Sequence, residues 1–443
     1  MTTFRFREFL ENKENEYTSM QVNIPMPSQV NILIDLFHKH EFELKPVGGA
    51  VRDYLFAHFH GNVKKYSPKD IDLATNATPD QVEKILESPD ARRYGIKVIP
   101  KGKAFGVISA VFPPDPAAPE KNQEYEIATY REEWYDPEGP GRRPDNVKFS
   151  TAAADAKRRD LTMNALFYDP KNQQVIDYNV NDEGKGQGIE DIQNRTARFV
   201  GNPRERIRED KLRILRLIRF FSRYNPGEMT QHMDKETIKA IEDFKHLAGV
   251  SPERITTEFV GGLEKSINPV NYLKNYMTIG RDNASHPYGL LSMVFPNMKI
   301  DVGDIDKIGN TKNPKAVLAW LLKSNPEVTK KLRDLKYPSD IFDVVNFLLK
   351  LYRFDPKNIS TLLNKRDIYK QEKDTELRDK KKSIMQKDIM DFAKIANMEN
   401  KLGHFVNYEP QAKAKDFMHL KGAEISKAMA NKEINAYLSS LGQ

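Results

Sequence analysis

The sequence contains no cysteine and only two tryptophans in 443 residues. The lack of cysteine excludes disulfide bonds, thiolate metal sites and cysteine nucleophiles, so any bound metal is expected to be a hard ion held by oxygen ligands. The sequence also lacks a run of roughly 20 apolar residues, the length that a membrane-spanning helix needs. The charged residues 1–16 include no apolar stretch of signal-peptide length, so a cytoplasmic location is expected.

The composition is that of a polar globular protein whose positive charge is concentrated in one window. Hydrophobic residues make up 39% of the chain and charged residues 30%, and the length allows roughly two to four subdomains. The net charge is only +7, yet between Arg195 and Arg223 ten basic residues accompany three acidic ones, so this window carries the equivalent of the whole net charge. Such a positive stripe predicts a polyanionic partner, either a nucleic acid or a triphosphate.

Two adjacent glycines, Gly48 and Gly49, mark the first candidate site. They follow a predicted strand over residues 42–47 and precede a predicted helix over residues 50–59. This arrangement leaves backbone N–H groups uncovered at a helix start, where a phosphate binds. Taken alone, such a pair is more often a plain tight turn.

Two aspartates, Asp70 and Asp72, mark the second candidate site. Alternation along a strand places both carboxylates on one face and Ile71 and Leu73 on the other, which predicts one wet face and one core face. Carboxylates at this spacing can hold a hard cation. An EF-hand loop is excluded because its third ligand position is occupied by Ala74.

A third carboxylate is a candidate for the same cation site. Two further strands are predicted over residues 107–112 and 125–131, and Glu126 lies on the second one, opposite to Tyr125 and Ile127. If its face is the aspartate face, Glu126 joins the cluster. The residue pattern by itself leaves this open.

Asp210 and Arg213 form a further pair inside the basic window. The spacing of Ile207, Ile214 and Phe221 predicts a helix with one apolar stripe, on which Asp210 falls and which Arg213 flanks. Burying a charged carboxylate in an apolar core costs free energy unless a charged or hydrogen-bonding partner pairs with it. The two side chains are therefore either an ion pair that fixes the helix or a donor and acceptor that read a base edge. Asp210 would accept from the exocyclic amine of cytosine or adenine, and Arg213 would donate to the adjacent ring atom.

In combination these motifs resemble class II CCA-adding enzymes and bacterial poly(A) polymerases. The family's motifs occur in the same order, over about residues 28–265, as Val47–Asp53, Lys69–Thr75, Glu126–Arg131, Arg158–Asp160 with Asn164–Ala165, and Glu209–Arg216. Residues 420–425 are similar to the family's tail, far less specifically. The resemblance implies an α+β fold, with a small mixed-sheet nucleotidyltransferase (polymerase beta-like) head followed by an all-α neck, body and tail and the active site in the head–neck cleft.

The resemblance and the fading of strand signals past Asp177 divide the chain into five expected segments. They are an N-terminal extension (1–24), a catalytic head (25–165), a neck with the base-selecting helix (166–265), a helical body (266–360) and a helical, tRNA-binding tail (361–443).

The family implies a role for each motif. Asp70 and Asp72 would hold two Mg²⁺ ions, which activate the 3′-hydroxyl of an RNA and neutralise the leaving pyrophosphate, and Glu126 would complete or orient that cluster. Asp210 and Arg213 would select CTP and ATP without a nucleic-acid template. The phosphates and ribose would contact Gly48, Gly49, Arg52, Arg158, Arg159, Asp160 and Asn164. Further contacts are expected from Arg216 and Arg219 of the neck and from Arg142 and Arg143 of a flexible loop.

The expected function is template-independent addition of C, C and A to the 3′ end of tRNA, with the helical C-terminal half holding the tRNA elbow. The alternatives are a poly(A) polymerase and an RNA-binding protein that has lost catalysis. The loop over residues 139–144 resembles that of the full CCA enzymes, and the presence of all three carboxylates argues against lost catalysis. Two departures from the family pattern, Leu161 for Phe and Lys211 for Pro, change no polar contact.

Two features allow more than one interpretation. His58 and His60 could bind a metal, although a pair in this context is more typical of a surface loop. The mixed-charge run over residues 364–387 is either a solvated helix face or a contact with an RNA backbone.

Overall fold

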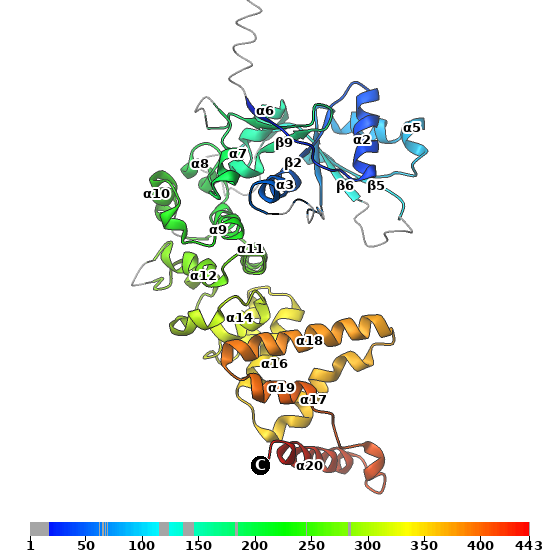
Figure 1. Cartoon of the computed structure of the whole chain (residues 1–443), viewed down its shortest axis with the longest axis vertical. Coiled ribbons are helices and arrows are strands. Elements are labelled where there is room, and N and C mark those ends of the chain that lie inside the picture. Colours follow the sequence, from blue (N-terminus) through cyan, green and yellow to red (C-terminus); the bar gives the residue numbers. More distant parts are fainter. Residues whose placement is uncertain are drawn as a thin grey trace, which may run out of the picture. The chain divides into compact units, whose positions relative to one another are not determined.

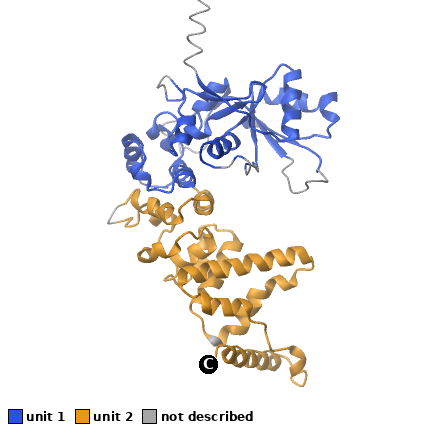
Figure 2. Cartoon of the chain, viewed as in Figure 1, with its two compact units in different colours: residues 1–250 blue, residues 251–443 orange. Residues whose placement is uncertain are grey.

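The computed structural model of the chain divides into two compact units, Met1–Val250 and Ser251–Gln443, which we describe separately (Figure 2). The structure describes residues 17–61, 63, 66, 68, 70–114, 124–135, 146–181, 185–244, 246–281 and 285–442. Within these ranges no helix combines the length and the apolar character that crossing a membrane requires.

Unit 1 is built on a mixed sheet with the strand order β1-β10-β9-β2-β3-β6-β5-β4 in its described part. Neighbouring strands are antiparallel except for β3 and β6, which run parallel. The strands are β1 (Tyr17–Gln21), β2 (Leu44–Val47), β3 (Asp72–Thr75), β4 (Lys97–Gly102), β5 (Val107–Val111), β6 (Glu124–Thr129), β9 (Leu166–Asp169) and β10 (Gln174–Tyr178). Two further strands, β7 (Arg131–Trp134) and β8 (Asn146–Phe149), form a separate two-stranded ribbon.

Helices pack on this sheet and continue beyond it (Figure 1). They are α2 (Ser28–Lys39), α3 (Gly49–His60), α4 (Pro79–Leu86), α5 (Pro89–Arg92), α6 (Ala152–Lys157), α7 (Gly188–Gln193), α8 (Pro203–Glu209), α9 (Leu212–Tyr224) and α10 (Lys235–Asp243), with 3₁₀ turns η2 (Lys103–Phe105), η3 (Thr162–Asn164) and η4 (Met229–Gln231). One face of the sheet is the predicted apolar core, in which Leu73 of β3 and Ile127 of β6 are buried with Phe37 of α2. Burial of this face fixes the register of the strands that carry the candidate site.

The head sheet is larger than the sequence suggested. It contains β9 and β10 and so extends to Tyr178, past the expected boundary at residue 165. Residues 17–21, expected as part of a polar extension, form β1 and pair with β10, which satisfies backbone groups that would otherwise lie at an open edge. Unit 1 ends at Val250, earlier than the expected end of the neck at residue 265. The subdivision of the chain into body and tail stays a prediction.

The single helix expected across residues 207–221 is interrupted, and this expectation was wrong. α8 ends at Glu209, and Asp210 has the extended angles φ −156° and ψ 107°. Its carboxylate accepts a hydrogen bond of 3.1 Å from the N–H of Leu212, at the start of α9. Aspartate favours such a helix-start position because its oxygen satisfies a backbone donor that lacks a helical partner. Asp210 therefore begins a helix instead of lying on an apolar stripe.

The described part of unit 2 is helical. Its helices are α11 (Pro252–Lys265), α12 (Pro269–Thr278), α13 (Gly289–Val294), α14 (Pro314–Leu321), α15 (Val328–Asp334), α16 (Ser339–Tyr352), α17 (Ile359–Arg366), α18 (Thr375–Ala396), α19 (Glu399–Asn407) and α20 (Ala423–Ser440), with 3₁₀ segments η5 (Val302–Ile308), η6 (Pro356–Asn358), η7 (Asp367–Gln371) and η8 (Ala414–Phe417). Three of them start with a proline at the first position, where the missing N–H has no helical partner in any case.

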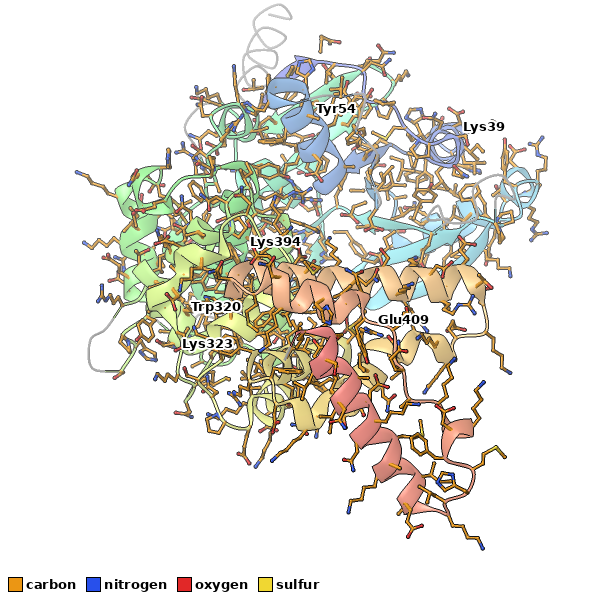
Figure 3. The ribbon with its side chains drawn as sticks, turned by 60° about the horizontal axis from the view of Figure 1, so that its bottom comes forward. Lys39, Tyr54, Trp320, Lys323, Lys394 and Glu409 are labelled. Carbon is orange, nitrogen blue, oxygen red and sulfur yellow. The ribbon has the colours of Figure 1, made fainter. Side chains whose placement is uncertain are left out.

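α14 is the central helix of unit 2 and packs against α16 and α18 (Figure 1). All its residues from Ala316 to Leu321 are buried. Trp320 donates from Nε1 to the carbonyl oxygen of Asp304 at 3.1 Å, and the Nζ of Lys323 lies 3.9 Å from the centre of its ring (Figure 3). In α18 the buried residues begin at Asp388, so the preceding charged turns are largely exposed, which agrees both with a solvated helix face and with a contact to an RNA backbone.

Candidate active site

The glycine turn forms the expected strand–turn–helix connection between β2 and α3. Gly48 has φ +65°, a left-handed value that glycine adopts without steric cost. Its N–H donates to the carbonyl oxygen of Leu166 at 3.0 Å, so the turn is tied to β9. The N–H groups of Gly49, Ala50 and Val51 begin α3 and have no intrahelical acceptor, as a phosphate site needs.

Two guanidinium groups lie directly over this turn. A Cβ atom on Gly48 would come within 3.2 Å of Nη1 of Arg159, and one on Gly49 within 3.6 Å of Nη2 of Arg52. The absence of side chains at both positions therefore leaves room for two cationic groups beside the helix start. Backbone N–H groups and arginines together are the donors that a triphosphate requires.

Arg52 is buried, with 5% of its surface exposed, and ties α3 to α9. Its Nε donates to Asp53 Oδ1 at 2.9 Å and to the hydroxyl of Tyr224 at 2.6 Å, and its Nη1 donates to Asn164 Oδ1 at 2.5 Å. The Tyr224 hydroxyl in turn donates to Asp53 at 2.5 Å, and Arg223 forms an ion pair of 2.7 Å with the same carboxylate. Although burial raises the pKa of Asp53, Arg52, Arg223 and the tyrosine hydroxyl lower it below its usual value.

Arg158 and Arg159 are oriented by one buried carboxylate, Asp155. Nε of Arg158 donates to Asp155 Oδ1 at 2.8 Å, and Nη2 of Arg159 donates to Oδ2 at 3.0 Å. Burial raises the pKa of Asp155, but the two guanidinium groups outweigh this effect and lower it. Arg158 also contacts Glu133 of β7 at 2.9 Å. Arg159 therefore reaches the glycine turn in a fixed orientation, while Arg158 links Asp155 to the β7–β8 ribbon.

Asp160 links the head to α9 a second time. It accepts from Nε of Arg216 at 2.7 Å and from Nδ2 of Asn164 at 3.0 Å. Although burial raises it, these two partners hold the pKa of Asp160 well below its usual range. Arg52 and Asp160 thus share Asn164, which makes this buried amide the junction of the glycine turn, the Arg-Arg-Asp motif and α9.

Phe220 of α9 is surrounded by three guanidinium groups. The centre of its ring lies 4.5 Å from Cζ of Arg52, 5.6 Å from that of Arg216 and 4.3 Å from that of Arg219. The ring is buried and offers each cation a π face or edge in place of water. This places Arg216 and Arg219, both predicted as neck contacts, beside the site.

Asp72 and Glu126 lie on neighbouring strands, whereas Asp70, expected on the same strand as Asp72, precedes β3. Ala74 pairs with Ala128 in the parallel β3–β6 register, so Asp72 and Glu126, each two residues earlier, share one sheet face. Asp72 and Glu126 are exposed at this face, as is Asp70 just before β3. Partial desolvation and the like charge of Asp70 raise the pKa of Asp72, while Arg159 lowers it.

This pair of carboxylates fits a divalent cation. Two neighbouring negative groups are stabilised by a bound positive ion, and oxygen ligands suit a hard ion such as Mg²⁺. In the described ranges, however, no three Asp, Glu, His or Cys side chains converge into a ready metal cluster. Glu126 therefore stays a predicted member of the cluster. His60 contacts the backbone carbonyl of Ile192, with Nε2 2.9 Å from that oxygen.

Arg213 and Asp210 are adjacent to the site, and the ion pair between them, one of the two interpretations that the sequence left open, is not formed. Nη1 of Arg213 contacts a carboxylate oxygen of Glu209 and donates to the carbonyl oxygen of Arg206 at 3.2 Å. Asp210 accepts instead from the backbone of α9. The partner of Arg213 is therefore the residue that precedes Asp210, and the i,i+4 spacing of Glu209 and Arg213 is the signal that identifies it.

Several supporting residues were missed from the sequence. They are Asp53, Glu133, Asp155, Phe220 and Tyr224. Asp155 could have been found, because it precedes Arg158 and Arg159 by three and four residues on a helix. The contacts of Asp53 and Tyr224 leave no such local pattern. Arg142 and Arg143, the expected flexible-loop contacts, lie outside the described residues.

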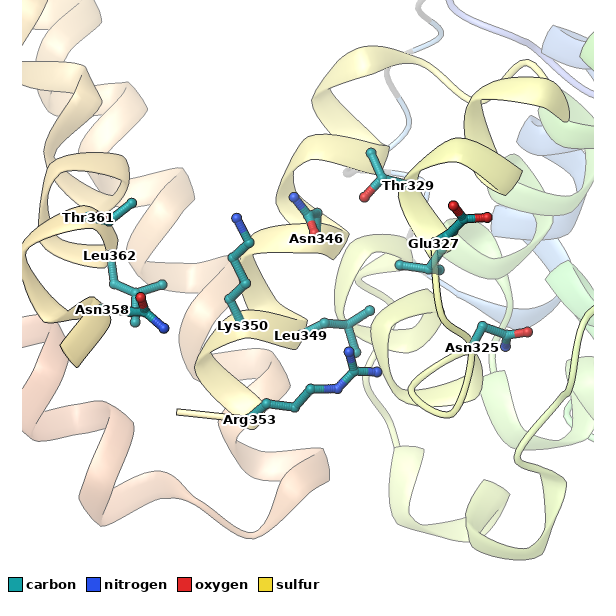
Figure 4. Close-up of a pocket in the computed structure, with 11 residues that line it drawn as sticks. Asn325, Glu327, Thr329, Asn346, Leu349, Lys350, Arg353, Asn358, Thr361 and Leu362 are labelled. Carbon is teal, nitrogen blue, oxygen red and sulfur yellow. The ribbon is translucent and has the colours of Figure 1, made fainter. Parts of the chain in front are cut away.

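Unit 2 contains a separate polar pocket of about 310 Å³ (Figure 4). Lys350 and Arg353 from the end of α16 line it together with Asn358 and Thr361. The lining also includes Glu327, so the two cations leave a net positive charge that suits an anionic ligand.

Taken together, the mixed-sheet head, the glycine turn, the paired carboxylates and the arginine-lined helix define a nucleotidyltransferase. Residues 45–198 match the model of the poly A polymerase head domain. The chain is 30% identical to a CCA-adding enzyme of Staphylococcus saprophyticus over 75% of this chain and 79% of that protein. The chain thus belongs to the family of class II CCA-adding tRNA nucleotidyltransferases and poly(A) polymerases.

Other relatives agree with this assignment. The chain is 35% identical to CCA tRNA nucleotidyltransferase 1, mitochondrial, of Homo sapiens over 72% of its length, and it spans 65% of the length of that relative. The fold is also that of solved CCA-adding enzymes. The Bacillus stearothermophilus enzyme in complex with CTP superposes with a TM-score of 0.60 and 22% sequence identity, over 93% of this chain and 94% of that chain. The Thermotoga maritima enzyme complexed with tRNA superposes with a TM-score of 0.58 and 16% sequence identity, over 96% of this chain and 99% of that chain.

Proposed function

We propose that this protein adds C, C and A to the 3′ end of tRNA, using CTP and ATP. The observation that carries the proposal is the direct connection between the glycine turn and α9. Arg52 reaches from the turn to Tyr224, and Asp160 pairs with Arg216, so the phosphate-binding and base-selecting elements belong to one hydrogen-bonded unit. The names of the relatives, CCA-adding enzymes, agree with this activity.

The triphosphate would bind at the start of α3. The N–H groups that follow Gly48 and the guanidinium of Arg159 supply the donors. Ion pairs with Asp155 hold the side chains of Arg158 and Arg159 in place. Arg52 is buried and saturated by its partners, so its role is to position the turn and Asn164. Asn164 would then orient the ribose.

Asp70 and Asp72 would hold two Mg²⁺ ions, with Glu126 orienting them. Bound there, the ions supply Lewis acidity to the attacking 3′-hydroxyl and to the leaving pyrophosphate. The chain's own contribution is positional: β3 and β6 present the carboxylates on one face, and Arg159 stands between them and the glycine turn as a fixed positive charge. The exposed position of Asp72 admits both the ion and the RNA end.

Base selection would use Asp210 and Arg213. Among the described residues the hydrogen bonds of the Arg213 side chain use Nη1, which leaves Nε and Nη2 for a ring nitrogen or carbonyl. Glu209 holds the guanidinium in place while the base is read. Uracil and guanine present the opposite donor and acceptor pattern and would leave buried groups unpaired.

Unit 2 would bind the RNA backbone, and the pocket with Lys350 and Arg353 is one candidate contact. A location in the cytoplasm is part of the proposal and rests on the sequence alone.

The decisive experiment offers the protein a tRNA transcript that lacks its 3′-terminal CCA, with each nucleoside triphosphate singly and in mixtures. Addition of three nucleotides that stops after CCA is expected from CTP plus ATP. An unbounded A tract from ATP would indicate a poly(A) polymerase, the activity named by the head-domain model. RNA binding with no addition by freshly purified protein in Mg²⁺ would indicate a protein that has lost catalysis.

A further inference from the structure

The β7–β8 ribbon has two chemically different faces. Arg131 and Glu133 lie on the inner face, and because side chains alternate, Glu132 and Trp134 lie on the outer one. Across the ribbon Trp134 pairs with Asn146, and Glu132 pairs with Lys148. All four outer residues are exposed, whereas Arg131 and Glu133 are partly buried.

The inner face anchors the ribbon to the candidate active site. Glu133 accepts from Arg131 and from Arg158, each at 2.9 Å, and Arg158 belongs to the phosphate-binding motif. Phe149 at the end of β8 packs over the turn at Gly106, where an added Cβ would come within 3.1 Å of its ring. These contacts hold the ribbon beside the candidate active site, and the outer face points away from the core.

Trp134 is the most exposed aromatic side chain in the described part of the chain, with 60% of its surface accessible. An exposed indole on a rigid ribbon exposes a large apolar surface to water and loses little conformational freedom when it binds a flat partner. Lys148 stands on the same face, and within the described residues it forms no ion pair that would neutralise it. A planar ring beside an unneutralised cation is the arrangement on which single-stranded nucleic acids stack.

We propose that Trp134 is a stacking platform for an unpaired base near the 3′ end of the RNA substrate, with Lys148 beside it for the adjoining phosphate. The proposal rests on the proposed function, because that function places a single-stranded RNA end at this site. The platform holds the end of the RNA while the base of the incoming nucleotide is read at α9.

Intrinsic fluorescence gives a direct test, because the chain has only two tryptophans. Trp320 is buried in unit 2 and bonded to a carbonyl oxygen, so its emission is a constant background. We expect a stem-loop RNA with one unpaired 3′ nucleotide to quench the emission, a blunt stem of the same sequence to leave it unchanged, and Trp134→Phe to abolish the response. Equal quenching by both RNAs, or by CTP alone, would overturn the proposal.

Kinetics on the full-length protein give the second test. Trp134→Ala should raise the KM for tRNA on the order of tenfold, more than it lowers kcat, and leave the KM for CTP unchanged. Trp134→Phe should restore most of the loss, since phenylalanine keeps a stacking face. Tyr94→Ala, a control that removes another exposed ring of the same unit, should change neither constant.

An unchanged KM for tRNA in Trp134→Ala would refute the stacking role. If the unmodified protein adds no nucleotide at all, the proposed function fails, yet the fluorescence comparison of overhang and blunt RNA still decides whether Trp134 stacks on a base.

Discussion

Unit 1 and unit 2 each contain a buried arginine, Arg52 and Arg366, and each arginine pairs with the aspartate that follows it. The distant partners of the two differ. In unit 1 Arg52 bonds the side chains of Asn164 and Tyr224, the latter 172 residues away along the chain. In unit 2 Arg366 donates to the backbone carbonyl oxygens of Phe405 and Tyr408.

This difference separates positioning from simple stabilisation. A charged group that bonds backbone atoms satisfies a helix or loop end and has no further geometric consequence. A charged group that bonds other functional side chains sets their orientation as well, so its loss disturbs both the fold and the site. Four comparisons test this reading, from the largest expected effect to the smallest.

Removing the carboxylate pair should have the largest effect and leave the fold intact. Asp70→Ala combined with Asp72→Ala should lower nucleotide incorporation by at least about a thousandfold, because the cation site is lost. Binding of tRNA, measured by filter retention, should persist. Asp35→Ala on the exposed side of α2 is the matched control. Incorporation that survives the double substitution would rule out the metal assignment.

Removing a base-reading group should change selectivity more than rate. Arg213→Ala should reduce the preference for CTP and ATP over UTP and GTP by roughly ten- to a hundredfold. In the variant a wrong base no longer leaves the buried donors of Arg213 without an acceptor, so its binding no longer costs that free energy. Competition assays with all four nucleotides measure this ratio. Arg208→Ala, on the exposed side of the neighbouring helix α8, should leave selection strict. Strict selection by Arg213→Ala itself would contradict the assignment.

One buried arginine from each unit tests the comparison directly. Arg52→Ala and Arg366→Ala should each lower the free energy of unfolding by about 3 kcal/mol, because each leaves a buried acceptor without its charged partner. At a temperature where both variants are folded, only Arg52→Ala should lose kcat/KM for nucleotide addition. Equal activity losses in the two variants, judged against folded fraction by circular dichroism, would show that the two networks do not differ in function.

The stability of unit 1 should depend on pH because of one buried carboxylate, that of Asp177. Burial, with a smaller contribution from the nearby Asp191, raises the pKa of Asp177 to about 7, although hydrogen bonds from the backbone N–H groups of Ile189 and Gly188 act against this rise. Since the unfolded value is about 4, unfolding releases a proton between these values, and stability falls as pH rises from about 4 to 7.

Asp177→Asn cannot ionise, so its stability should be flatter over this range. Between pH 5 and pH 7.5 the free energy of unfolding of the variant, relative to that of the unmodified protein, should rise by on the order of 1–3 kcal/mol. Urea unfolding at the two pH values measures this change. Parallel stability curves for the two proteins would contradict the assignment of a protonated Asp177.

Much of the site was predictable because its rules are local. The turn at Gly48 depends on a left-handed backbone angle that its own residue type allows, and the shared face of Asp72 and Glu126 follows from strand alternation and parallel pairing. The helix across residues 207–221 was mispredicted for an equally local reason. Asp210 can either continue an apolar pattern or accept from a helix start, and the backbone hydrogen bond prevailed.

The sequence by itself therefore determined elements that depend on a few neighbouring residues, such as the glycine turn between β2 and α3. Only the tertiary structure decided which charges meet. Arg52 pairs with a tyrosine from the far end of unit 1, and Asp160 pairs with Arg216 of α9. The window around α9 holds many arginines of equal intrinsic propensity, and the choice among their partners depends on burial and distance, which exist only after the sheet and α9 have packed together.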